Sequence, residues 1–84
     1  MQKKQYILEK WEDDEILFAD GLDDAIIGYD PINQRVVYSI SDCIEVMSKD
    51  MSVDDAIEYL EYNTFNAYVG DKTPIWVDDN KHFY

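Results

Sequence analysis

The stretch "RVVYSISDCIEVM", residues 35–47, carries the change of hydrophobic period that decides the fold class. Its first half, "RVVYSI", is rich in β-branched and aromatic residues, as is typical of a strand. From Ile40 onward the period is that of a helix face, with apolar residues at Ile40, Cys43, Ile44, Met47 and Met51. The stretch therefore predicts a strand followed directly by a helix, which we expect over about residues 41–50.

Two serines mark where helices are expected to begin. Ser39 stands three positions before an aspartate, the spacing of an N-cap with an acidic third residue, although Ser41 is an equally good candidate. In "SVDDAIEYLEY" Ser52 has the same relation to the acidic first turn that follows it. This second pattern predicts a helix over about residues 53–68, with Gly70 as its stop.

Three further segments complete the expected architecture. "DAIIGYD" and "RVVYSI" flank the turn-forming "PINQ" and predict an antiparallel hairpin over about residues 24–40. "TPIWVDD" predicts a C-terminal strand over about residues 74–78, and "YILEKWEDDE", residues 6–15, has the spacing of a short N-terminal helix. We expect a single α+β domain, residues 1–84, in which a small antiparallel sheet packs on two central helices.

The apolar positions also predict a core and a mode of assembly. One cluster is expected to bury Ile27, Val37, Ile44, Met47, Ile57, Leu60 and Ile75. Each strand carries apolar residues on both faces, but only two helices are predicted firmly enough to cover the sheet. The second face must therefore be covered by the N-terminal segment or by another molecule, and we predict a homodimer that added salt strengthens.

Charge restricts the classes of partner. The chain has 84 residues, of which 19 are Asp or Glu and 7 are Lys or Arg, giving a formal net charge of -12. A field this negative disfavours direct binding to nucleic acid or to an anionic membrane, and it favours a protein partner with a basic surface.

The compartment is predicted from what the sequence lacks. Cys43 is the single cysteine, so no intrachain disulfide can form, and a reducing environment is indicated. Residues 1–15 lack the apolar run of a signal peptide, and no run approaches the roughly 20 residues that span a bilayer. We expect a soluble cytoplasmic protein, and no motif indicates a cofactor.

Three pieces together resemble a widespread family of small acidic phage-encoded proteins of unassigned function: "DGLDDAIIGYD", "VVYSISDCIEVM" and "MSVDDAIEYLEYNTFNAYVGDKTPIWV". The resemblance covers about residues 19–77. It departs from the family pattern at Leu22 and Trp76, where Phe is usual, and at Asn66, where Gly is usual. The resemblance implies a phage or prophage setting, hence the host cytoplasm, and no particular chemistry.

Asp20, Asp23 and Asp24 are the first candidate site. An EF-hand calcium loop needs oxygen ligands at positions 1, 3 and 5 and a glycine at position 6. Counting from Asp20, position 3 is Leu22 and position 6 is Ala25, so the template fails. A turn leading into the strand is the favoured interpretation, and we predict neither a metal site nor catalytic residues. The alternative is a small metal-assisted hydrolase that uses these three aspartates.

A thiol–imidazole dyad is the second candidate. It would need Cys43 and His82, the only histidine. Because Cys43 lies on the apolar face of its predicted helix, the thiol is expected to be buried and inert. The acid pair Asp13/Asp14 is one of several in the chain and indicates nothing by itself.

The aromatic stretch "YLEYNTFNAYVG", residues 59–70, is the third candidate. Leu60 and Ala67 are expected to face inward, but Tyr59, Tyr62, Phe65 and Tyr68 are too many for so small a core. They either complete the core or form the centre of a protein interface, where aromatic side chains are enriched.

The function predicted from these features is that of a small acidic phage-type interaction protein without catalytic activity. It would dock on a basic surface of a host or phage protein, using the four aromatic side chains with Asp20, Asp23 and Asp24. A narrower form is a DNA mimic, whose carboxylates occupy a nucleic-acid-binding groove. A binder of a small ligand would instead require a pocket.

Overall fold

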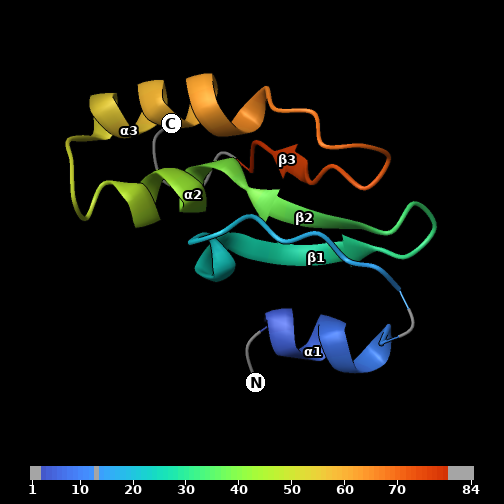
Figure 1. The fold of residues 1–84 in the computed structure, drawn as a ribbon. Coiled ribbons are helices and arrows are strands. Elements are labelled where there is room, and N and C mark those ends of the chain that lie inside the picture. The colour runs from blue at the N-terminus through green and yellow to red at the C-terminus, as the bar shows by residue number, and fades with distance from the viewer. Residues whose placement is uncertain (1–2, 13, 80–84) are drawn as a thin grey trace.

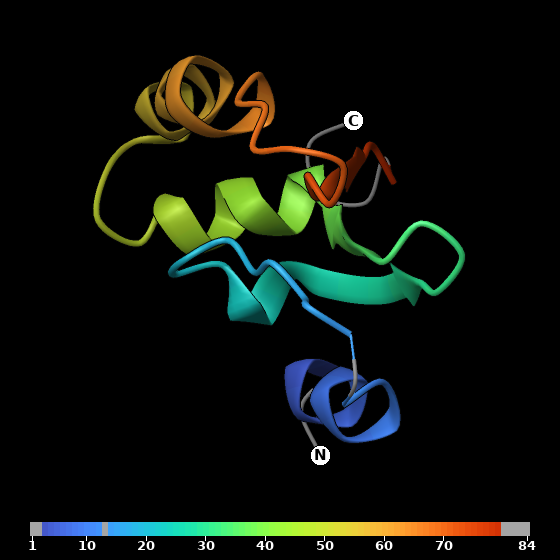
Figure 2. The same cartoon turned by 45° about the vertical axis from the view of Figure 1, so that its right-hand side comes forward.

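The computed structural model describes residues 3–12 and 14–79, and within them it has the predicted α+β fold (Figure 1). The elements are α1 (Lys3–Lys10), the short 3₁₀ helix η1 (Asp23–Ala25), β1 (Ile26–Asp30), β2 (Arg35–Ser39), α2 (Ile40–Met47), α3 (Val53–Leu60), the π-helical η2 (Glu61–Phe65) and β3 (Ile75–Val77). The helices α1 and α3 lie at opposite ends, with the sheet and α2 between them (Figures 1 and 2). No helix in residues 3–12 and 14–79 is long and apolar enough to cross a membrane.

The sheet has the strand order β1-β2-β3, and its two pairings run in different directions. β1 and β2 form the predicted antiparallel hairpin, whereas β3 lies parallel to β2. The expectation of a wholly antiparallel sheet is therefore wrong for the third strand. The reason is the connection, because α2, α3 and η2 carry the chain back to the start of the sheet, as parallel pairing requires.

The hairpin turn is closed by Asp30. Its carboxylate accepts hydrogen bonds from the backbone N–H groups of Ile32 (3.0 Å) and Asn33 (3.3 Å) and from the Asn33 side chain (2.9 Å). The side-chain bond from Asn33 is the main cause that lowers the pKa of the Asp30 carboxyl. Gln34 completes the turn with a positive φ of 59°. The turn is thus specified by local hydrogen bonds, as its composition predicts.

The strands bury the opposite set of residues from the one predicted. Val36 and Tyr38 are fully buried, while Val37 and its neighbour across the sheet, Ile75, are only partly buried. A bulge between Ile26 and Gly28 brings Ile26 into the core and leaves Ile27 partly exposed. The prediction that Ile27, Val37 and Ile75 are core residues is wrong, because strands that are apolar on both faces give no period-2 signal for the inner face.

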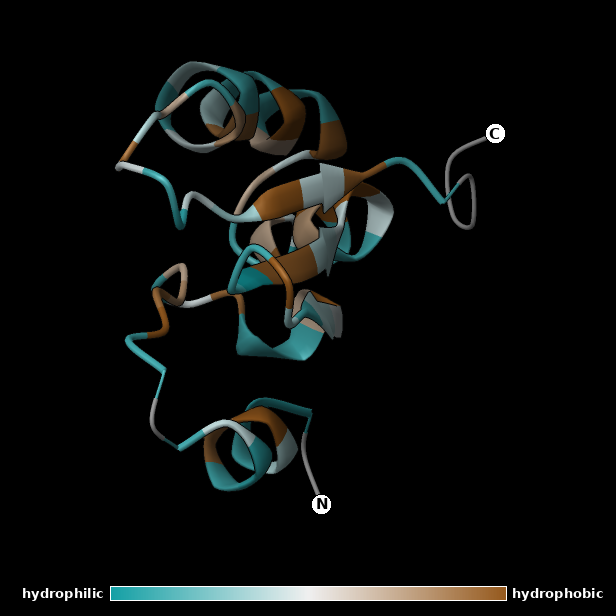
Figure 3. Cartoon of the chain, turned by 90° about the vertical axis from the view of Figure 1, so that its right-hand side faces the viewer, coloured by the Kyte–Doolittle hydropathy of each residue, from teal (hydrophilic) through white to brown (hydrophobic). Residues whose placement is uncertain are grey.

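The helices contribute to the core much as expected. Ile44 and Leu60 are buried, and Met47 and Ile57 are partly buried against them. Among the described residues, the buried core cluster comprises Ile7, Leu22, Ala25, Ile26, Val36, Tyr38, Cys43, Ile44, Ala56 and Leu60. Figure 3 shows apolar stretches along the strands and alternating apolar and polar stretches along α3. Burial of these side chains is the main stabilising contribution to the fold.

The N-terminal segment covers one face of the sheet. α1 spans Lys3–Lys10 rather than 6–15, and it buries Ile7 while Leu8 is exposed. After the helix, the indole of Trp11 packs on the Tyr29 ring at a centroid distance of 4.8 Å. Farther along, the backbone N–H of Ala19 donates a 2.7 Å hydrogen bond to the buried Tyr38 hydroxyl. These contacts lie on the face that carries Tyr38 and Trp76, where Phe65 also packs, so coverage of the opposite face by the N-terminal segment stays a prediction.

Both predicted N-caps are present, and both helices end earlier than predicted. The hydroxyls of Ser39 and Ser52 each accept a 3.1 Å hydrogen bond from the backbone N–H three residues later, so Ser39 rather than Ser41 caps α2. α2 ends at Met47 and η2 at Phe65. Because the helix stops before residue 67, Ala67 is exposed and the expectation that it faces inward is wrong.

Candidate functional site

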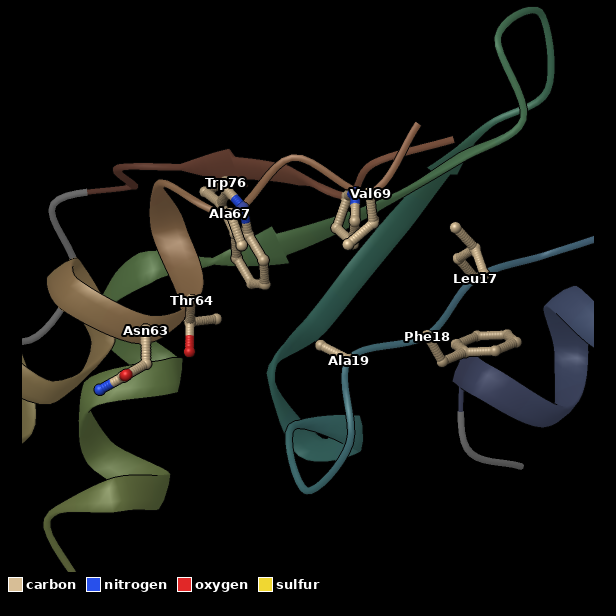
Figure 4. A pocket seen from close by; sticks show the side chains of 9 residues that line it. Leu17, Phe18, Ala19, Asn63, Thr64, Ala67, Val69 and Trp76 are labelled. Carbon is tan, nitrogen blue, oxygen red and sulfur yellow. The ribbon is translucent and has the colours of Figure 1, made fainter. Parts of the chain in front are cut away.

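An apolar hollow lies where the N-terminal segment, the end of η2 and β3 come together, and we call it the Trp76 pocket (Figure 4). It has a volume of about 310 Å3 and is lined by Leu17, Phe18, Ala19, Asn63, Thr64, Ala67, Val69, Pro74 and Trp76. Figure 4 shows Leu17, Phe18 and Ala19 on one side and Trp76, Ala67 and Val69 on the other. Nearly all of these groups are apolar, so the pocket favours an apolar occupant.

The indole of Trp76 is held in place by two other rings. It lies 4.9 Å from the Tyr38 ring and 5.1 Å from the Phe65 ring, measured between centroids. Tyr38 is itself fixed by burial and by its bond from Ala19. Phe65 is therefore a packing residue behind the pocket wall, which is the core interpretation of this side chain, while the Trp76 ring forms the wall itself.

The loop that carries Val69 is closed by Thr73. The Thr73 hydroxyl accepts a 2.9 Å hydrogen bond from the Val69 backbone N–H and donates a 2.6 Å bond to the Gly70 carbonyl. Gly70 has a φ of 108°, a conformation that side-chain-bearing residues rarely adopt. The prediction that Gly70 ends the helix is therefore wrong. Gly70 instead shapes the loop that places Val69 in the lining of the pocket.

One polar atom of Trp76 lacks a partner. The indole Nε1 is buried and has no hydrogen-bond acceptor within residues 3–12 and 14–79. Most buried donors in proteins are satisfied, and one left unpaired costs about 1–3 kcal/mol.

Acidic surface flanks the pocket on two sides. On one side, Leu17 and Val69 also line a shallower hollow, of about 370 Å3, with Glu15, Asp71 and Lys72. On the other side, Asn63 also lines a hollow of about 300 Å3, whose remaining members are Asp55, Glu58, Tyr59 and Tyr62. These two hollows, which we call the acidic rims, hold four carboxylates and one ammonium group.

Three of the four predicted aromatic residues are exposed beside this pocket. Tyr62 is 86% exposed, Tyr68 is 77% exposed and Tyr59 is 46% exposed. Tyr59 and Tyr62 belong to an acidic rim, and Tyr68 lies between the pocket residues Ala67 and Val69 in sequence. The prediction of site residues missed Leu17, Val69 and Trp76. Leu17 stands in the apolar run "ILFA", residues 16–19, Val69 in the aromatic stretch and Trp76 in the predicted C-terminal strand.

The three predicted aspartates do not join this surface. They occupy the turn and η1, which lie on the other side of α2 from α3 (Figures 1 and 2). Asp23 pairs with Lys4 at 3.3 Å, Asp20 is exposed, and Asp24 lines a separate small hollow near the end of α2. Gly21, with a φ of 78°, makes the turn. No group of three metal-ligating side chains occurs among the described residues.

Cys43 is fully buried. Burial raises the pKa of its thiol to about 12, so the thiol is protonated at neutral pH and a poor nucleophile. The other member of the hypothesised dyad, His82, lies outside the described residues, as does Asp13 of the pair Asp13/Asp14.

Comparison with protein-family models, curated proteins and solved structures finds no match to this chain. Membership of the phage-encoded family that the sequence resembles therefore stays a prediction. The function has to be argued from the pocket, its acidic rims and the exposed tyrosines.

Proposed function

We propose that this protein is a small acidic interaction protein of phage type, acting in the host cytoplasm without catalytic activity. It docks on a basic surface of a host or phage protein through its exposed tyrosines and the carboxylates around them. The observation that carries the proposal is the rim in which Tyr59 and Tyr62 stand exposed beside Asp55 and Glu58. Rigid aromatic side chains contribute contact area at low entropic cost, and carboxylates steer a basic partner into register.

The experiment compares which proteins different variants retain from a lysate of infected host cells. A partner should bind the parent protein and be released by about 0.5 M salt, because charge pairs on a surface are screened. It should be lost from Tyr59→Ala with Tyr62→Ala. The matched control is Ile32→Ala, since Ile32 is 89% exposed in the hairpin turn, outside the rims and the pocket. Retention of the same partners by the double variant would refute the proposal.

A narrower form of the proposal is DNA mimicry. Four carboxylates on the two rims, in a chain of net charge -12, supply the negative charge that a nucleic-acid-binding groove selects. Duplex DNA should then compete with the protein for the captured partner. Capture that DNA leaves unchanged would restrict the proposal to ordinary protein docking.

We also propose a homodimer formed through the second face of the sheet. Val37 and Ile75 share that face and are partly exposed, and their burial would favour association. Repulsion between two chains of net charge -12 opposes it and is screened by salt, so the dimer should be stronger at high salt. Light scattering measures the mass at about 0.05 M sodium chloride, where the repulsion is weakly screened, and at about 0.5 M, where it is strongly screened. A monomer at both salts would exclude the dimer.

A further inference from the structure

We propose that the Trp76 pocket receives a single apolar anchor side chain from a basic segment of the partner. This inference rests on the proposed function, since it specifies how the partner is held. It identifies the occupant by chemistry: a large aliphatic or aromatic residue with lysine or arginine on both sides.

The size and lining of the pocket define the anchor. A dry protein cavity of roughly 150 Å3 is large enough for benzene, so about 310 Å3, partly open to solvent, has room for one aromatic ring or a long aliphatic side chain. The walls are apolar groups from Leu17, Ala67, Val69, Pro74 and Trp76. Water is a poor occupant, because it needs two to four polar partners and this lining offers few.

The aromatic wall of the pocket is formed by the indole of Trp76. The Tyr38 and Phe65 rings pack against the indole at centroid distances of 4.9 Å and 5.1 Å, so its position is fixed before the partner arrives. Such preorganisation lowers the entropic cost of binding.

The rims define what flanks the anchor. Glu15 and Asp71 stand on one side of the pocket, and Asp55 and Glu58 on the other. Within the rims these four carboxylates are opposed by Lys72 alone. Cationic residues on both sides of the anchor match this pattern, whereas an anionic ligand is repelled.

The test uses three synthetic peptides, titrated at fixed salt while the indole N–H signals are followed by NMR. The first peptide is Lys-Lys-Phe-Lys-Lys, the second has Ser in place of Phe, and the third has Gln in place of every Lys. The variant Trp11→Phe assigns the two indole signals, since the chain has 2 tryptophans. The Phe peptide should bind about 10- to 100-fold more tightly than the Ser peptide, as expected for burying one aromatic side chain. Binding should also shift the Trp76 indole signal.

Three variants locate the effect. Ala67→Leu places extra carbon atoms in the pocket from an exposed position, and it should remove most of the preference for Phe over Ser. Trp76→Phe keeps an aromatic wall of smaller contact area, so affinity for the Phe peptide should fall about 2- to 10-fold. Ile32→Ala, remote from the pocket lining, should leave both affinities unchanged.

The outcomes separate the two proposals. Equal affinity for the Phe and Ser peptides would refute the anchor pocket and leave docking by charge intact. Equal affinity for the Lys and Gln peptides that contain Phe would keep the pocket and refute the basic partner. Self-association that Ala67→Leu abolishes would make a second copy of the chain the occupant, and would overturn the proposal made here.

Discussion

Along the helix formed by α3 and η2, Ala56 and Leu60 are buried on one side, while Tyr59 and Tyr62 on the other are 46% and 86% exposed. The inner side contributes to the same apolar cluster as the strands, and the outer side forms part of an acidic rim. Neighbouring residues of one helix thus serve different purposes, and exposure predicts which changes affect stability and which affect binding.

Leu60→Ala should have the largest effect on stability. Removing a fully buried leucine leaves a cavity and should lower the free energy of unfolding by about 2–5 kcal/mol. Tyr62→Ala, on the exposed side, should change it by less than about 0.5 kcal/mol. Denaturant unfolding followed by circular dichroism measures both. An unchanged midpoint for Leu60→Ala would mean that the inner side of the helix is misassigned.

The same contrast applies to two neighbours in β2. Val36 is fully buried, whereas Val37 faces the other side and is partly exposed. Val36→Ala removes two buried carbon atoms and should cost about 2 kcal/mol, and Val37→Ala should cost less than half as much. The same unfolding experiment ranks the two variants. The reverse order would restore the strand face expected from the sequence and contradict the register of the hairpin.

Alkaline pH should destabilise the protein in part through the buried thiol of Cys43 in α2. Burial raises the pKa of Cys43 from 9.0 to about 12, so the folded protein keeps a proton that the unfolded chain releases above about pH 9. The stabilising effect is complete below pH 9 and is lost as the pH rises toward 12. At pH 10 this thiol should account for a loss on the order of 1 kcal/mol relative to neutral pH.

The control for the alkaline effect is Cys43→Ala, which removes the titrating thiol. Its free energy of unfolding should fall less steeply between pH 8 and 10 than that of the parent protein. Tyr38 adds to the loss at higher pH, because burial raises the pKa of its hydroxyl to about 12 as well. Free energies of unfolding measured at several pH values would give both slopes. Parallel slopes for parent and variant would show that Cys43 is not protected in the folded state.

The sequence predicts most of the fold and less of the site. Period and caps specify α2 and α3 because Ser39 and Ser52 act locally, and "PINQ" specifies the hairpin for the same reason. The direction of β3 depends on how the helical connection packs, which no local pattern records. The Trp76 pocket combines residues from positions 17, 69 and 76, so it exists only after folding, whereas the exposed tyrosines could be predicted by counting aromatics.

The smallest expected effect concerns the ion pair between Lys4 and Asp23, whose side chains are 36% and 41% exposed at a separation of 3.3 Å. Lys4 also stands 4.9 Å from the centre of the Phe18 ring. Water and salt screen such a pair, so Lys4→Met, which keeps an apolar stem over Phe18, should cost about 0.2–1 kcal/mol at low salt.

Ile7 in the same helix is buried, so Ile7→Ala is the matched variant and should cost several times more. Unfolding in urea at low salt and at about 0.5 M salt measures the free energy that each variant loses. Because urea is non-ionic, only the added salt changes the ionic strength. If Lys4→Met costs as much as Ile7→Ala, charge rather than burial attaches α1 to the sheet, and exposure would no longer predict the energetic role of a residue in this protein.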